Sequence, residues 1–535
     1  MALQRYSFPL RDGRPREDEL RCHSWQVNVS HIKPWLALVA LALVSFTGPS
    51  DRQRASDTAA ASEYEFSHES VIEEARRLAA REYAPRELPE NSPLMQLSYD
   101  EYREIRFNSE RGIWRNEQVP FRLELLTAGF IYRTPVTVAV VESGRAHNLL
   151  GTPDLFTFGP KVQRFAGETM PLSGFRVRTR LNSRSTWDEF LSFQGASYFR
   201  AVARDTVYGL SARGLALRTA HPTGEEFPAF THFWIERPAA NATGIVIHAL
   251  LDSPSATGAY RFSVIPGTET VMDVDVTLFP RRPLDAVGIA PLTSMFLFNG
   301  SDRSRIDDFR NAVHDSDGLQ ILSAAGEQIW RPLANPTQLQ ISSFTSTAPR
   351  GFGLVQRARK LSDYQDLSSQ WHRRPSVWVE PKGEWGAGAV ELIEIPTDFE
   401  GNDNIVAMWR PRNAIPAGSP WRTSYRLRWS RHPPTISSLA KVVATRSGPT
   451  RDGRRRMFVV DFDAAASAPE RLRLEIGSSA GKLSNQSLTY NPLTRGVRAT
   501  FELDPANATL AELRLRLLRG DEPVSETWLY RWTAS

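Results

Sequence analysis

The chain has 535 residues, of which 41% are hydrophobic and 23% are charged. At roughly 150 residues per domain this allows about two to four domains with ordinary buried cores, and it excludes a chain that is disordered for most of its length. The net charge is only +5, and positive and negative side chains are interspersed. Because there is no basic stripe of the kind that nucleic-acid-binding proteins carry, we expect no nucleic-acid partner.

An apolar run near the N-terminus is the first element along the chain. Trp35 to Phe46 is twelve residues long and follows Lys33. That length suits the core of a signal peptide and is short for crossing a bilayer. No Arg-Arg pair precedes the run, so we predict a Sec-type signal and export to the periplasm. The alternative is a buried helix of a cytosolic domain.

The segment before the first domain is predicted to be removed or to act as a tether. Residues 1–61 comprise the signal segment and a polar, small-residue stretch. The only cysteine, Cys22, lies in it. We therefore expect no disulfide, thiolate metal site or cysteine nucleophile in the exported chain.

Two short helices are predicted next. Apolar residues recur at helical spacing from Ser67 to Ala84, with acidic residues early in the run. Residues 99–106 (YDEYREIR) form a second candidate helix.

Beyond residue 106, short β-rich runs separated by Gly, Pro, Asn and Asp dominate the sequence. Strands are predicted at Phe121–Leu126, Val136–Val141, Phe175–Arg178, Gly244–Leu251, Ala259–Val264, Thr270–Leu278 and Val390–Ile395. Many strands without alternating helices favour antiparallel sheets in a sandwich or barrel.

A break at Pro433 and Pro434 predicts a second domain. The last hundred residues again show alternating runs, at Met457–Phe462, Leu472–Ile476, Val497–Leu503, Leu513–Leu518 and Thr527–Trp532. Their length and spacing fit an immunoglobulin-like sandwich. We therefore predict an all-β protein with a large β-sandwich over residues 62–432 and a C-terminal sandwich over residues 433–535.

Two polar clusters interrupt the β-rich sequence. His314-Asp315-Ser316-Asp317-Gly318 and Glu400-Gly401-Asn402-Asp403-Asn404 each combine carboxylates with turn-forming residues. One interpretation is a turn, with Gly318 at positive φ, and another is a functional carboxylate at the rim of a sandwich. A metal site at His314–Gly318 is less favoured, because hard cations need more carboxylates at closer spacing.

Aromatic residues suggest a carbohydrate ligand. Five tryptophans fall between residues 330 and 409, interleaved with arginines and acidic residues: Trp330, Trp371, Trp378, Trp385 and Trp409. Sugars stack their apolar faces on such rings, and their hydroxyls bond to charged side chains. Core packing is the competing role for each ring. The sequence has no glycine-rich phosphate loop, HExxH or paired CxxC motif, so we expect neither a metal nor an organic cofactor.

A series of long motifs resembles one known family. In order, they are GASYFR (195–200), YGLSARGLAL (208–217), ALLDSPSATGAYRF (249–262), GIAPLTSMF (288–296), VHDSDGL (313–319), RPLANP (331–336), RGFGLVQR (350–357), RRPSVWVEP (373–381) and DNIVAMW (403–409). They are similar to the G and D proteins of osmoregulated periplasmic glucan biosynthesis. HDSDGL and the missing twin-arginine signal are closer to the G type.

The resemblance implies a fold, a substrate and a reaction. It implies a galactose-mutarotase-like sandwich followed by an immunoglobulin-like domain, and β-1,2-glucan as the ligand. It further implies an inverting endo-β-1,2-glucanase with Asp315 as general base and Asp403 as general acid. Two alternatives stay open: a non-catalytic scaffold that guides nascent glucan to a membrane glucan synthase or other periplasmic glucan enzymes, and a glucan-modifying transferase.

The long motifs also contain candidates for lining a sugar cleft. We expect this role for polar and aromatic side chains where a structural position would more often be aliphatic: Arg200, Arg213, Tyr364, Arg374, Trp378 and Glu380. Arg213 and Arg374 fit buried ion pairs equally well. Glu225 and Glu226 fit a structural role better.

Overall fold

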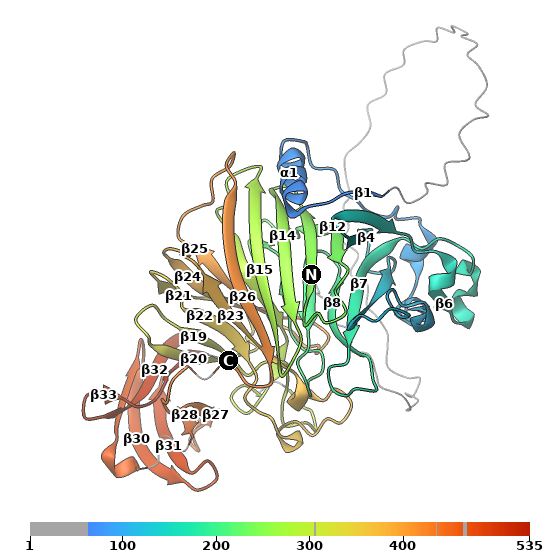
Figure 1. The fold of residues 1–535 in the computed structure, drawn as a ribbon. Helices are drawn as coiled ribbons and strands as arrows, with labels where there is room; N and C mark the ends of the chain where they lie inside the picture. Colours follow the sequence, from blue (N-terminus) through green and yellow to red (C-terminus); the bar gives the residue numbers. More distant parts are fainter. Residues whose placement is uncertain (1–62, 304–305, 435, 464–467, 535) are drawn as a thin grey trace, which may run out of the picture.

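The computed structural model describes residues 63–303, 306–434, 436–463 and 468–534. The predicted signal segment and tether, residues 1–61, lie outside these residues. The predicted all-β fold is confirmed, because strands make up nearly all the regular structure in the described ranges (Figure 1). No helix in those ranges combines the length and the apolarity needed to cross a membrane.

Two large sheets face each other. In the described part of the chain, the larger has sixteen strands and the smaller has ten. In spatial order, the large sheet contains β1 (Tyr64–Glu65), β5 (Arg145–Leu149), β4 (Thr137–Glu142), β12 (Ala229–Glu236), β13 (Ile245–Asp252), β14 (Ala256–Ile265), β15 (Glu269–Pro280), β26 (Trp421–Ser430), β23 (Ser376–Lys382), β22 (Gly351–Val355), β19 (Gly318–Leu322), β20 (Gln328–Pro332), β34 (Thr527–Thr533), β32 (Leu510–Arg519) and β29 (Arg473–Ser478), with β33 (Glu522–Pro523) paired to β32.

The small sheet carries Arg200 and Arg213, and Asp403 lies just before one of its strands. In spatial order it contains β21 (Gln340–Ser346), β24 (Gly388–Glu394), β25 (Ile405–Pro411), β16 (Val287–Ser294), β10 (Ser211–Arg213), β9 (Tyr198–Ala201), β8 (Asp188–Gln194), β7 (Leu172–Thr179) and β3 (Phe121–Thr127), with β11 (Ala216–Leu217) paired to β16. Two short ribbons pair β17 (Phe296–Phe298) with β18 (Val313–His314), and β2 (Ile105–Phe107) with β6 (Phe156–Phe158).

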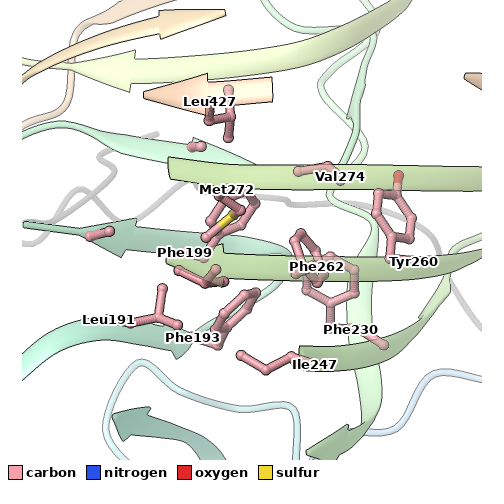
Figure 2. Packing of buried hydrophobic residues seen from close by; sticks show 14 of the residues in the cluster. Leu191, Phe193, Phe199, Phe230, Ile247, Tyr260, Phe262, Met272, Val274 and Leu427 are labelled. Atoms are coloured by element: carbon pink, nitrogen blue, oxygen red, sulfur yellow. The ribbon is translucent and has the colours of Figure 1, made fainter. Parts of the chain in front are cut away.

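The main core lies between these two sheets. Phe193 of β8 stacks on Phe199 of β9 at 5.1 Å, and both rings meet the edge of Phe262 from β14 at 5.1 and 5.3 Å. Figure 2 shows these rings packed with Met272 and Leu427 from the neighbouring strands β15 and β26. Alternate residues of each strand point into this core, so the other residues face outward on each sheet.

A second core lies among the C-terminal strands. β27 (Val442–Pro449), β28 (Arg456–Phe462), β31 (Gly496–Asp504) and β30 (Lys482–Asn491) form a four-stranded sheet that packs against β29, β32 and β34. β34 pairs in parallel with β20, so the large sheet continues into the C-terminal strands (Figure 1). Trp330 and Val355, from before residue 433, also join this core. The domain boundary at residues 432 and 433, and the immunoglobulin-like and galactose-mutarotase-like assignments, stay predictions.

Both predicted helices form but are shorter than expected. α1 (His68–Ala79) is capped at its N-terminus by Ser67, whose side chain accepts from the Ser70 N–H at 3.2 Å. It ends at Ala79, five residues before the end of the predicted run at Ala84. α2 is a single turn (Tyr99–Tyr102), because Ile105 and Phe107 are buried alternately in β2. The 3₁₀ turns are Pro93–Gln96, Ser109–Arg111, Pro153–Leu155, Pro160–Phe165, Leu361–Asp363, Trp371–Arg373 and Pro469–Arg471.

Candidate active site

The two candidate aspartates are anchored to one short stretch of backbone. Ser294, the last residue of β16, pairs with Ile405 of β25, and Phe296 of β17 pairs with His314 of β18. Asp403 lies two residues before Ile405, and Asp315 directly follows His314. Loops 88 residues apart in the sequence therefore flank the same three residues, 294–296.

Side-chain and backbone hydrogen bonds fix both loops there. The Asp315 N–H donates to the Met295 carbonyl at 2.9 Å. The Asn404 side chain accepts from the Phe296 N–H at 2.8 Å and donates to the Phe296 carbonyl at 2.9 Å. The Ser294 and Ser316 hydroxyls are bonded at 2.9 Å. Ser316, next to Asp315, and Asn404, next to Asp403, thus hold the two loops at the end of β16 by hydrogen bonds.

Asp315 is fully buried and paired with Arg374. The Arg374 guanidinium donates to Asp315 Oδ1 and lies over the Trp371 ring at 3.8 Å. Burial, reinforced by the Arg200 cation, lowers the pKa of Arg374 to about 9, whereas Asp403 acts to raise it. Arg374 therefore pairs with Asp315 and also interacts electrostatically with Asp403.

Asp403 lies beside the outward face of the small sheet. Phe199 and Ala212 point into the main core, so Tyr198 and Arg213 on the same strands point the other way. Burial raises the pKa of Tyr198 to about 12, and the Asp403 carboxylate contributes to that rise. Asp403 therefore lies near the face of the small sheet that carries Tyr198 and Arg213.

Arg213 and Arg200 both lie on this face and have different partners. Arg213 is 1% exposed, pairs with Glu225 at 2.8 Å and lies over the Tyr198 ring at 5.1 Å. Arg200 is half-buried and lies over the Tyr208 ring at 5.8 Å. The buried ion pair considered for Arg213 therefore forms, and its role in lining a sugar cleft stays a prediction.

Tyr364 packs against His314, the residue before Asp315. Its side chain is fully buried, its hydroxyl donates to the Ala358 carbonyl at 3.2 Å, and its ring meets the edge of His314 at 5.1 Å. His314 in turn stacks on Phe296 at 5.4 Å. Tyr364 thus lies within a small apolar cluster behind Asp315.

Trp378 and Glu380 point away from the main core. Val377 and Val379 fill that core, so their neighbours on β23 face the opposite side of the large sheet. There Glu380 accepts from Arg428 at 2.7 Å, and the Trp378 ring packs where a side chain on Gly351 would stand. The fold does not bring these two residues to the aspartates by any contact among the described residues.

An arginine not singled out from the sequence joins the loops around the aspartates. Arg310 pairs with Asp308 at 2.8 Å, Asp366 at 3.0 Å and Glu400 at 2.6 Å. Asp366 also accepts from the Trp371 indole N–H at 2.9 Å. The cluster links the Asp403 loop to the segment that carries Arg374. The acidic residues were visible in the sequence, but their common partner was not.

The turn interpretation of residues 314–318 needs one correction. Gly318 does not adopt positive φ, because it begins β19 in strand conformation. A Cβ at this position would lie 2.5 Å from the Trp330 ring. Glycine is required here because the Trp330 ring approaches the backbone closely. Asp315, in the loop before Gly318, is fully buried.

Comparisons with known proteins agree with the motifs. A family model described as "Periplasmic glucan biosynthesis protein, MdoG" matches residues 66–532. The chain is 48% identical over 473 residues to "Glucans biosynthesis protein G 1" of Shewanella oneidensis, covering 88% of this chain and 87% of that protein. It is 46% identical over the same length, with the same coverage, to "Glucans biosynthesis protein G" of Vibrio cholerae serotype O1. Among solved structures, chondroitinase AC lyase matches with a TM-score of 0.20 and 11% identity, over 78% of this chain and 49% of that one, which supports no argument.

Proposed function

The chain belongs to the periplasmic glucan biosynthesis protein family, MdoG, and from this premise we propose that it cuts β-1,2-glucan as an inverting endo-glucanase. The family itself indicates a periplasmic protein of glucan biosynthesis. The reaction, the linkage and the export signal are parts of the proposal.

One observation carries the proposal. Asp315 and Asp403 come from distant parts of the sequence and are anchored to the same residues at the end of β16. Inverting glycosidases need two carboxyl groups about 6.5–9.5 Å apart, one on each side of the scissile bond. A shared anchor supports such a pair, since it fixes both loops relative to one strand.

The surroundings support different roles for the two carboxyl groups. Asp315 pairs with the Arg374 guanidinium, and a neighbouring cation favours the ionised form that a general base requires. Asp403 is 8% exposed and lies near the Tyr198 side chain, whose pKa it helps to raise. Substrate covering it would disfavour its charged form and favour the protonated carboxyl of a general acid.

In the proposed reaction, Asp403 donates its proton to the glycosidic oxygen as that bond breaks. Asp315 takes a proton from a water molecule, which attacks the anomeric carbon from the opposite face. In this proposal Arg200 and Tyr198, on the outward face of the small sheet, contact sugar hydroxyls. The product has the inverted anomeric configuration.

A non-catalytic scaffold is the second candidate, and the burial of Asp315 favours it. The Asp315 carboxylate is 0% exposed and ion-paired, and an aspartate with a purely structural role has the same features. In that case the polar face of the small sheet would bind glucan and pass it on unchanged.

The two candidates are separated by incubating the exported chain with linear β-1,2-glucan. Chain length is followed by chromatography, and the anomer of the product by polarimetry. We expect shortening with inversion, abolished in Asp403→Asn and in Asp315→Asn. Asp273→Asn is the matched control, since Asp273 is ion-paired to Arg426 at 2.7 Å on the other side of the large sheet. Bound but unshortened glucan would favour the scaffold.

A further inference from the structure

A polar pocket lies on the outward face of the large sheet, away from the aspartates. It has a volume of about 340 Å³, within the range of roughly 300–1,000 Å³ found for small-ligand sites. α1 covers part of this face and packs on β13, β14 and β15 (Figure 1). The pocket lies at the first turn of α1, where Phe66 and His68 meet His248 of β13.

Three lining side chains form a chain of hydrogen bonds. His248 Nε2 lies 2.8 Å from Glu236 Oε1, and His248 Nδ1 lies 3.0 Å from His68 Nδ1. A carboxylate only accepts, so this network assigns the His248 proton to Nε2. His248 Nδ1 then accepts from His68 Nδ1–H, which leaves Nε2 of neutral His68 as an acceptor.

The same network keeps His68 neutral at the pH of the periplasm. Burial, the neighbouring His248 and the Arg261 cation lower the pKa of His68 to about 4, against an opposing effect of Glu236. His248 is 2% exposed, so the acceptor on His68 is held by a buried partner. The pocket therefore presents a fixed acceptor at neutral pH.

The charges around the pocket are balanced, which disfavours an anionic ligand. Arg237 is already paired with Glu117 at 2.6 Å and with Glu142 at 3.5 Å. Arg261 has Asp275 at 3.8 Å, and Glu236 adds a carboxylate to the lining. A metal is also disfavoured, because no group of three His, Cys, Asp or Glu in the described ranges is arranged to hold one.

What the pocket does offer is a mixture of acceptors, donors and an aromatic ring. Glu236 and His68 accept, the two arginines donate, and Phe66 supplies an apolar surface stacked on Trp234 at 5.6 Å. Neutral sugars bind to this combination, through hydroxyls on the polar groups and C–H faces on the ring.

We propose that the pocket lined by Phe66, His68, Glu236, His248 and Arg261 is a second binding site, for a glucose residue of the glucan chain. This rests on the proposed function only in taking glucan as the ligand. The site would hold the polymer on the side of the large sheet opposite the main core, while the residues around the two aspartates would hold another part of it or another chain.

Histidine side-chain NMR tests the proposal directly. The Asp403→Asn chain, labelled with ¹⁵N-histidine, is titrated with the β-1,2-linked glucose disaccharide, and the His68 signals are assigned by their loss in His68→Ala. We expect saturable shifts of the His68 and His248 signals. In His68→Ala and in Arg261→Ala, affinity read at His248 should fall at least about tenfold, the effect of losing one well-made hydrogen bond to a held partner.

The control is Arg422→Ala, an exposed arginine on the same outward face of the sheet but outside the pocket, which should leave the affinity unchanged. No histidine shift with the disaccharide, or shifts with inorganic phosphate alone, would overturn the proposal. Failure of the proposed function is seen separately, as unshortened glucan with Asp403 intact. The histidine signals report on the pocket in either case.

Discussion

The buried pair of Arg374 and Asp315 gives the sharpest test of how the candidate site is held together. Arg374 is 4% exposed and Asp315 is 0% exposed, so neither charge is solvated by water. Removing one partner of such a pair leaves an uncompensated buried charge and costs about 3–5 kcal/mol. We therefore expect Arg374→Met, which keeps the apolar stem, to lower the free energy of unfolding by that amount at pH 7.

The loss should depend on pH in a defined direction. Without the guanidinium, burial favours the neutral form of Asp315, so the folded variant binds a proton more readily than the unfolded chain. Stability of the variant then falls as pH rises above the unfolded carboxyl value of about 3.9, and its deficit against the wild type shrinks on acidification.

Urea unfolding at several pH values measures both effects. Adding Asp315→Asn to Arg374→Met should recover part of the loss, with a coupling of about 0.5–3 kcal/mol. Arg428→Met is the control, since its partners Glu380 and Glu269 are about a third exposed, and exposed pairs contribute only about 0–1 kcal/mol. A deficit for Arg374→Met below about 1 kcal/mol, unchanged with pH, would refute the reasoning.

Three further predictions concern buried positions in the rest of the fold. Gly318→Ala should destabilise the chain by about 1–3 kcal/mol in urea unfolding, because its Cβ would stand 2.5 Å from the Trp330 ring. Glu526→Gln should cost about 3–5 kcal/mol in the same assay, since the buried Glu526 carboxylate is the partner of Arg357 between the two cores. Burial lowers the pKa of His232 from 6.5 to about 4, so the unfolded chain binds this proton first and stability falls as pH drops through that window. The melting temperature of His232→Asn should therefore fall less between pH 7 and pH 5 than that of the wild type.

Matched controls separate these effects from general damage. Gly448→Ala places a Cβ where nothing lies within 4 Å, so it should leave stability unchanged. Glu512→Gln removes a pair with Arg531 in which the glutamate is 44% exposed, and it should cost no more than about 1 kcal/mol. Equal losses in a variant and its control would contradict the corresponding explanation. For His232, the explanation would be contradicted if the melting temperature of His232→Asn fell as much between pH 7 and pH 5 as that of the wild type.

Local pattern in the sequence determined much of the fold. Strands predicted from alternation, such as Thr270–Leu278 and Val497–Leu503, form as β15 (Glu269–Pro280) and β31 (Gly496–Asp504). The predicted start of the first helix at Ser67 is confirmed by its capping bonds. These features follow from residues within a few positions of one another, so sequence alone carries them. The family resemblance and its lean toward the G type are confirmed by the comparisons.

Only the tertiary structure decided which side chains meet. The register of β16 against β25, and of β17 against β18, brings Asp315 and Asp403 to one place, and no local pattern encodes that register. The same holds for Trp378 and Glu380, because whether an alternating residue faces the core or solvent depends on which sheet the strand joins. It holds again for the shared ion pairs of Arg310. Sequence spacing fixes the periodicity of a strand, but the pairing of strands distant in the chain sets the contacts, since it is burial across the whole sheet that selects one register.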